Sequence, residues 1–216
     1  MLGGMPLVPS KDPQLVLLRH GETAWSASGQ HTGRTDLPLT DAGVEQARTA
    51  GHALAGITFT AVYASPLERA RHTAELVGHP DAVADPDLAE WDYGPVDGRT
   101  SADVSEAIGH EFQIFEDGVR VLSPDPAHGD GRPGELLADV AARARRFVER
   151  ADTTLQAGGN VLAVAHGHLL RVLATAWIGV DPRYAARLEL GTAAICQLGY
   201  GHDLRTIEGW NLPPHV

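Results

Sequence analysis

The chain has little cysteine and no long apolar run, and each shortage excludes a class of protein. Its single cysteine, Cys196, cannot form an intrachain disulfide, which excludes a secreted fold framed by disulfides. No apolar run approaches the roughly 18 residues that a membrane-spanning helix needs. Residues 1–11 lack the apolar core of a signal peptide. We therefore expect a cytoplasmic protein.

Basic residues are also few, and lysine is almost absent. Lys and Arg number 17 against 28 Asp and Glu, which gives a formal charge of −11 at pH 7. An acidic chain without a basic block is a poor ligand for nucleic acid or an anionic membrane, so we expect neither as a partner. Lys11 is the only lysine. Codon bias favouring arginine explains this, or some arginines act as planar forks for phosphate or carboxylate.

The length and composition indicate one domain. The 216 residues are 43% apolar and 21% charged, which is ordinary for a globular protein. We expect a single domain over 1–216, with residues 1–13 as a flexible N-terminal extension. The stretch 123–134 is rich in proline and glycine and is expected to form a surface insertion without regular structure.

Strand-like and helix-like segments alternate along the chain. Buried strands are predicted at 14–18, 61–64 and 161–165, and two more at 193–198 and 204–207 around a turn at 199–203. Helices are predicted at 40–56, 66–77, 135–157 and 167–178, with a shorter one in 101–118. The segments 21–39 and 79–100 are expected to be loop or turn. This alternation predicts an α/β fold, a three-layer αβα sandwich around a mostly parallel sheet.

Polar residues that follow the predicted strands point to a site. Ligands of an open α/β sheet bind beyond the carboxyl ends of the strands. Arg19 and His20 follow the first strand, Arg69 lies in the helix after the second, and His166 and His168 follow the third. Imidazole can accept a phosphoryl group, and arginine forks neutralise its oxygens. The helix opening at Gly167 adds backbone N–H donors.

A leaving oxygen also needs a proton donor, and Glu90 is the best carboxylate for that task. It follows an apolar stretch and precedes Trp91 and Tyr93, whose rings are expected to raise its pKa by desolvation. The arginines, imidazoles and carboxylate together predict a site for phosphoryl transfer.

These residues resemble a known family. Leu18-Arg19-His20-Gly21-Glu22-Thr23 is similar to the signature of the histidine phosphatase superfamily, in its phosphoglycerate mutase-like branch. Further segments resemble the family in order and spacing, from about residue 14 to residue 200. They are Thr40-Asp41-Ala42-Gly43, Ser65-Pro66-Leu67-Glu68-Arg69-Ala70 with Thr73-Ala74, Leu88-Ala89-Glu90 with Gly94 and Gly98, and Ala165-His166-Gly167-His168.

The resemblance implies roles for individual residues. His20 is implied as the phosphoryl acceptor, Glu90 as the acid and then the base, and no metal ion or cofactor is implied. Arg19, Arg69 and His166 are implied to complete the phosphate pocket. Two positions depart from the family pattern: Ser26 stands where many members have asparagine, and Pro133-Gly134-Glu135-Leu136 stands where they have G-G-E-S. The expected substrate-binding residues are Ser26, Thr32, Gly33, Tyr93, Gly167 and His168.

Several of these residues have simpler interpretations. His166 and His168 could be a metal-binding pair, although alternate residues of a strand point to opposite faces. His31 is interpreted equally well as structural or as part of the site. The arginines at 143, 145, 146 and 150 are predicted to lie on the solvated face of an amphipathic helix. Cys196 is expected to be a small buried hydrophobe.

The sequence therefore favours a metal-independent phosphomonoester phosphatase that acts through phosphohistidine on a small phosphorylated metabolite. A phosphoglycerate mutase-type phosphotransferase and a non-catalytic phosphate-binding regulatory protein remain as alternatives. Residues 100–134 contain only Arg120 and Arg132 among many acidic residues. Such a wall is expected to repel a second anion, which favours the phosphatase. The family resemblance also implies a possible homodimer.

Overall fold

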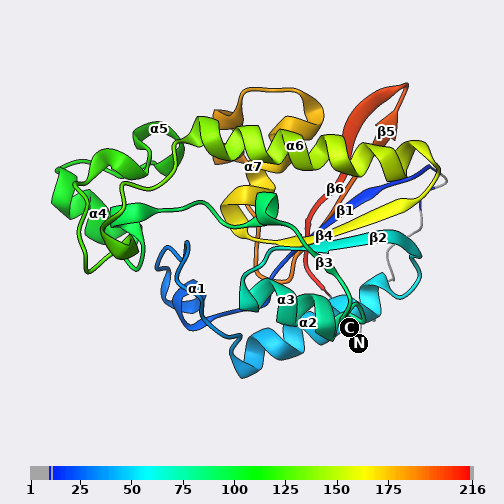
Figure 1. Ribbon diagram of the computed structural model, residues 1–216, viewed down its shortest axis with the longest axis horizontal. Helices are drawn as coiled ribbons and strands as arrows, with labels where there is room; N and C mark the ends of the chain where they lie inside the picture. Colours follow the sequence, from blue (N-terminus) through cyan, green and yellow to red (C-terminus); the bar gives the residue numbers. More distant parts are fainter. Residues whose placement is uncertain (1–9, 11, 215–216) are drawn as a thin grey trace.

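A six-stranded mixed sheet forms the centre of the computed structural model, which describes residue 10 and residues 12–214 (Figure 1). The strand order is β3-β2-β4-β1-β5-β6. The bounds of the strands are β1 Leu15–Arg19, β2 Phe59–Ala64, β3 Val83–Ala84, β4 Asn160–Ala165, β5 Ile195–Gly201 and β6 Leu204–Leu212.

The strands β3, β2, β4 and β1 run parallel, which confirms the predicted α/β class with a mostly parallel sheet. The last two strands differ from that pattern, because β5 lies antiparallel to β1 and β6 antiparallel to β5. Their turn is tighter than the expected 199–203. His202 and Asp203 make it with φ angles of 51° and 64°, so the strands extend to Gly201 and from Leu204.

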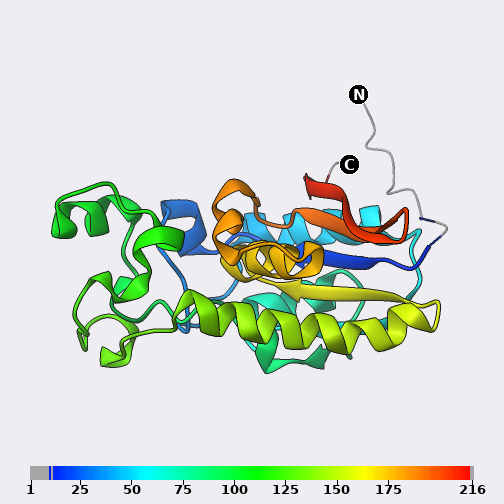
Figure 2. The same cartoon turned by 90° about the horizontal axis from the view of Figure 1, so that it is seen from above.

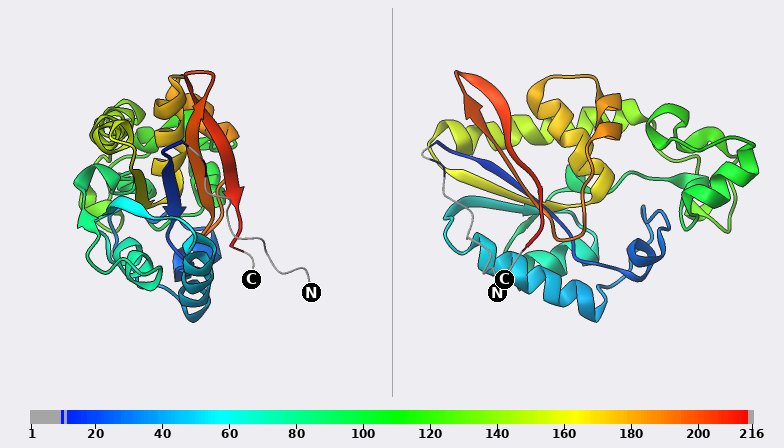
Figure 3. Two further views of the ribbon diagram at one scale, coloured as in Figure 1. Left: turned by 90° about the vertical axis from the view of Figure 1, so that its right-hand side faces the viewer. Right: turned by 180° about the vertical axis from the view of Figure 1, so that it is seen from behind.

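Helices cover both faces of the sheet, as expected for a three-layer sandwich. In Figures 1 and 3, α6 and α7 lie on one side of the sheet, and α2 and α3 lie on the other. The residues of β1 are buried on both faces: Leu15 and Leu17 pack with α6 and α7, while Val16 and Leu18 pack with α2 and α3. The bounds of these helices are α2 Asp41–Leu54, α3 Glu68–Leu76, α6 Leu137–Gln156 and α7 Gly167–Ile178.

The shorter helices differ most from the prediction. The helix expected within 101–118 is broken into α4 (Ser101–Ile108) and α5 (Ile114–Asp117), because Gly109 ends the first at φ 80°. A short helix, α1 (Ala24–Ser28), lies in the expected loop 21–39. Helix α3 begins at Glu68 rather than in the turn of Pro66, because Leu67 is extended with ψ 140°.

The segment that carries α4 and α5 extends beyond the carboxyl ends of β1 and β4 (Figures 1 and 2). Within it, 123–134 contains only a short 3₁₀ turn, Gly129–Gly131, and its backbone packs closely against Gly94. Most of the expected N-terminal extension, residues 1–9 and 11, lies outside the described residues. Among the residues that are described, no helix is both long enough and apolar enough to span a bilayer.

Two glycines bring the end of β1 against the start of α2. The backbone of Gly21 lies so close to Gly43 that a Cβ on either residue would meet a carbonyl oxygen at 2.2 Å or less. Thr40 caps α2 by accepting the N–H of Gly43, and its own N–H donates to Glu22 O at 2.9 Å. The segment that follows β1 is thus fixed by backbone contact with α2.

We predict that Gly43→Ala destabilises the protein, because its Cβ would lie 2.1 Å from the Glu22 carbonyl oxygen. Overpacking of this kind costs about 1–3 kcal/mol in the free energy of unfolding, which urea denaturation measures. Gly56→Ala is the matched control, since its Cβ meets nothing within 4 Å. Equal unfolding free energies for the two variants would contradict this interpretation of the contact.

Candidate active site

A cavity of about 180 Å³ lies at the carboxyl ends of the central strands. Strands β1 and β4 are neighbours, with Arg19 opposite Ala165, so the residues that follow them converge. The side chains of Arg19 and His20 come from the end of β1. Gly167 and His168 begin α7 after β4. The cavity is also lined by Ser26, Gln30, His31, Thr32, Glu90, Tyr93, Arg171, Glu189 and Leu190.

His20 has a fixed tautomer. Its Nδ1 lies 2.7 Å from the carbonyl oxygen of Gly21, which can only accept, so the ring proton is on Nδ1. Nε2 therefore carries the lone pair. Burial, followed by the charges of Arg19 and Arg69, lowers the pKa of His20 well below 6.5. The imidazole is neutral at pH 7 and chemically able to act as a nucleophile.

Arg19 supplies a cation with an unused donor. One terminal nitrogen donates to Leu190 O at 2.6 Å, but the buried Nε has no hydrogen-bond partner. That Nε has almost no exposed surface, so Arg19 reaches the cavity through the other atoms of its guanidinium. Burial lowers the pKa of Arg19, but arginine remains charged at pH 7. An anionic oxygen is the acceptor best suited to this position.

Glu90 is held at the N-terminus of α7. Its carboxylate accepts the backbone N–H groups of Leu169 at 2.9 Å, His168 at 3.2 Å and Trp91 at 2.9 Å. The first turn of a helix is a favourable place for a carboxylate. The contacts also mean that the amides of His168 and Leu169 are occupied, so of the backbone donors expected at this helix start the N–H of Gly167, which lines the cavity, is the one left for a ligand.

Arg69 and His166 lie beside the cavity rather than on its lining. Arg69 is fully buried, and its donors reach the carbonyl oxygens of Thr32, Gly33 and Thr35 at 2.9–3.0 Å. Its Nε donates to Nδ1 of His166 at 3.2 Å, so the proton of that neutral ring is on Nε2, which donates to Ser65 Oγ at 2.7 Å. The rings of His20 and His166 are 5.1 Å apart.

The expected substrate-binding residues divide into two groups. Ser26, Thr32, Tyr93, Gly167 and His168 line the cavity, whereas Gly33 does not, because its N–H donates to Asp97 at 2.6 Å. The Ser26 hydroxyl also closes the capping box of α1 with Thr23.

An aromatic wall joins Tyr93, His168 and His31. The Tyr93 hydroxyl hydrogen-bonds Nδ1 of His168, and the ring of His31 lies 5.2 Å from that of Tyr93. Burial lowers the pKa of His31 to about 4 and that of His168 well below 6.5, so both rings are neutral at pH 7. His31, which the sequence left open, belongs to the site lining.

Arg171 is the most consequential lining residue that the sequence analysis did not identify. It stands one helical turn after Gly167 on α7, and this i, i+4 spacing was the available signal. Its Nε donates to Ala185 O at 2.9 Å, and its guanidinium carbon lies 4.8 Å from the centre of the Phe115 ring. Gln30, Glu189 and Leu190 were missed as well, because loops bring them to the cavity.

Arg143 was expected on a solvated helix face, and that expectation is wrong. It is 6% exposed, pairs with Glu135 at 3.0 Å and donates to the backbone carbonyl oxygens of Asp87 and Ala89. Glu135 in turn accepts the N–H of Asp92 at 2.9 Å. This buried pair therefore fixes the backbone on both sides of Glu90. Arg145, Arg146 and Arg150 are exposed, as predicted.

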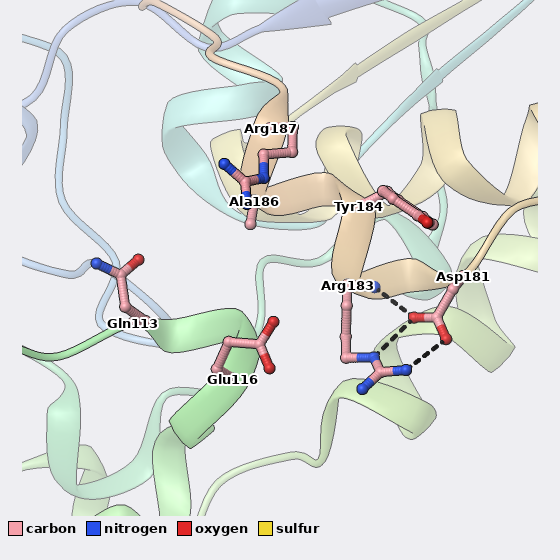
Figure 4. A pocket seen from close by; sticks show the side chains of 7 residues that line it. All are labelled: Gln113, Glu116, Asp181, Arg183, Tyr184, Ala186 and Arg187. Atoms are coloured by element: carbon pink, nitrogen blue, oxygen red, sulfur yellow. Dashed lines mark hydrogen bonds and ion pairs between the residues drawn. The ribbon is translucent and has the colours of Figure 1, made fainter.

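The expected acidic wall does not line this cavity. No residue of 100–134 is among the lining residues, and Arg120 donates to Gly134 O instead. A larger cavity of about 590 Å³ lies between α5 and residues 181–187 (Figure 4). There Arg183 is paired with Asp181, and no histidine lines it. Among the described residues, no three His, Cys, Asp or Glu side chains are placed to hold a metal ion.

Comparisons with known proteins agree with this geometry. The sequence profile described as histidine phosphatase superfamily (branch 1) matches residues 15–213. An acid phosphatase of Mycobacterium tuberculosis is 35% identical over 207 residues, which cover 95% of each chain. A 2,3-bisphosphoglycerate-dependent phosphoglycerate mutase of Azorhizobium caulinodans is 33% identical over 91% of this chain and 97% of its own.

A solved structure is also similar throughout. An open reading frame product of Mycobacterium tuberculosis superposes with a TM-score of 0.85 at 34% identity and covers 95% of this chain and 100% of its own.

We predict that the protein loses stability as the pH falls from about 6.5 to 5. Unfolded histidines bind protons near pH 6.5, whereas His20, His31, His166 and His168 stay neutral when folded because their pKa values are lowered. The unfolded state then binds more protons, and each such histidine contributes a slope of up to about 1.4 kcal/mol per pH unit.

Urea denaturation at a series of pH values measures this slope. His31→Gln removes one of the four groups and should give a shallower slope, whereas substituting the exposed His52 on α2 should leave it unchanged. Stability independent of pH across this range would show that the buried rings titrate normally.

Proposed function

The chain belongs to the histidine phosphatase superfamily, branch 1, and we propose that it is a phosphomonoester phosphatase that works through a phosphohistidine at His20 without a metal ion. The observation that carries this proposal is that a neutral His20 with the lone pair on Nε2, the guanidinium of Arg19 and the carboxyl of Glu90 all line one cavity. The substrate is a small phosphorylated metabolite, since the cavity holds only about 180 Å³.

In the first step, Nε2 of His20 attacks phosphorus and the ester P–O bond breaks. Arg19 binds the non-bridging oxygens and supplies the positive charge that a metal ion supplies in other phosphoryl-transfer enzymes. Glu90, as the general acid, gives a proton to the leaving oxygen. The ring proton of His20 stays on Nδ1, where Gly21 O accepts it.

In the second step, the Glu90 carboxylate takes a proton from water while the water oxygen attacks phosphorus. The N–P bond breaks, inorganic phosphate leaves, and His20 returns to its neutral form. In this proposal Arg69 and His166 do not line the cavity and act as positioning residues. Arg69 holds the 32–35 loop and the ring of His166, which lies beside His20.

Hydrolysis is favoured over phosphoglycerate mutation. A mutase must retain a bisphosphorylated intermediate, which carries two phosphates and a carboxylate, whereas the lining residues of the cavity include two arginines, Arg19 and Arg171, enough for one phosphate and one further acid. The similarity to an acid phosphatase over 95% of both chains supports the same choice. A non-catalytic phosphate-binding role is disfavoured because His20 and Glu90, the proposed nucleophile and acid, both line the cavity.

We predict that His20→Ala loses nearly all turnover, by a factor of at least about 10⁴, because the two-step route requires the nucleophile. The measurement is phosphate release from p-nitrophenyl phosphate in excess chelator, with His52→Ala as the control, since His52 lies exposed on α2. Rapid quenching with labelled substrate should leave an acid-labile label on His20 in the wild-type protein.

The fate of that label separates the two enzyme reactions. Chased with 3-phosphoglycerate, a phosphatase releases the label as inorganic phosphate, whereas a mutase transfers it to bisphosphoglycerate. A His20→Ala protein with the wild-type rate would refute the proposal, and transfer that exceeds release would replace phosphatase by mutase.

We predict that Glu90→Gln lowers kcat/KM for the hydrolysis of alkyl phosphates by about 10²–10⁴-fold, which is the range of general acid catalysis. The same variant should slow p-nitrophenyl phosphate by less than about tenfold, because nitrophenolate leaves without a proton. The measurement is the ratio of kcat/KM for the two substrates in each protein. Equal losses on both would indicate that Glu90 serves only to cap α7.

A further inference from the structure

We propose that Arg171 binds a second acidic group of the substrate, so that the protein acts on small phosphorylated acids in preference to neutral phosphomonoesters. This inference rests on the proposed function, because it assumes that the phosphate itself lies at His20 and Arg19. Arg171 lines the same cavity as Arg19 but comes from α7, whereas Arg19 comes from β1.

The first argument is the state of the Arg171 guanidinium. Its Nε is tied to Ala185 O, and its plane is supported by the Phe115 ring, so the group is held in one position. Across the described part of the chain, its terminal nitrogens have no hydrogen-bond partner and no carboxylate lies within ion-pair distance. Such a partly buried cation ordinarily has an anion beside it.

The second argument is the composition of the cavity. Arg19 and Arg171 both line it. Each donates one hydrogen bond to a backbone carbonyl oxygen and has other N–H groups without a protein acceptor. Two positioned arginine forks fit two acids, since each fork matches the two oxygens of a carboxylate or phosphate. Glu90 caps α7. Glu189 is near enough to offset part of the burial that lowers the pKa of Arg171, but it is exposed and forms no ion pair with it, so the terminal nitrogens stay open to a second acid.

The third argument concerns the remaining wall. His31, His168 and Tyr93 line the cavity as neutral groups, and Glu90 and Glu189 are the lining carboxylates. The acidic residues of 100–134 are not on the lining, so they do not oppose a second anion there. The small volume restricts the substrate to a few heavy atoms beyond the phosphate.

The test compares 3-phosphoglycerate with glycerol 3-phosphate, which share a carbon skeleton and differ in a carboxylate against a neutral alcohol. Binding is measured by calorimetry in the His20→Ala protein, where turnover does not interfere. We expect 3-phosphoglycerate to bind more tightly than glycerol 3-phosphate. In the same background, Arg171→Leu should weaken the affinity for 3-phosphoglycerate by about 10- to 100-fold and bring the ratio of the two affinities toward one.

Two further variants separate the effect of the Arg171 fork from that of charge alone and from that of removing any arginine. Arg171→Lys retains the charge without the fork and should give an intermediate ratio. Arg183→Leu is the matched control: it removes an exposed arginine that is paired with Asp181 in the neighbouring cavity (Figure 4), and it should leave the ratio unchanged. Thermal unfolding verifies that each variant is folded.

The outcomes distinguish this inference from the proposed function. Equal binding of the two compounds, or a preference for the acid that survives Arg171→Leu, would overturn the role of Arg171 even if the wild-type protein hydrolyses monoesters. Absence of turnover on every monoester in the wild-type protein would overturn the phosphatase, while the affinity ratio would still report on Arg171.

Discussion

The buried guanidinium of Arg69 is the contact on which the rest of the site depends. An arginine without solvent exposure is tolerated only if its donors are satisfied, and here the loop carbonyls at 32, 33 and 35 and the ring of His166 satisfy them. The loop therefore cannot move without leaving a buried charge unpaired. Because the same loop places Thr32 on the cavity, the phosphate region is shaped before any ligand binds.

A second buried cation, Arg143, holds the segment that carries Glu90. Arg143 and Glu135 bind the backbone at 87, 89 and 92, and Glu90 lies between those points. The carboxylate is then fixed from the other side by the first turn of α7. The 32–35 loop and the Glu90 carboxylate are thus held by separate networks, one anchored on α3 and the other on α6. Each network uses carbonyl oxygens that would otherwise be buried without a partner.

The central part of the fold and of the site was predictable from the sequence. Residues 15–18 of β1 and 161–165 of β4 are apolar because both faces of these strands are covered. The polar residues that follow them identified Arg19, His20 and His168. Loop conformation could not be derived from periodicity, so α1 and the buried place of Gly33 were missed. Arg143 was misassigned because its burial depends on Glu135, a partner that no helical pattern reveals.

The near-absence of lysine left two explanations open, and the structure separates them by location. In the interior, Arg69 and Arg143 each reach acceptors in several directions at once, which a lysine ammonium on a single stem cannot do in the same plane. On the surface, Arg48, Arg71 and Arg145 are exposed, and lysine would serve equally well there, so a compositional bias accounts for them. The excess of arginine is therefore no evidence for a phosphate site. That evidence is the lining of one small cavity by Arg19 and by a neutral His20 whose Nε2 carries the lone pair.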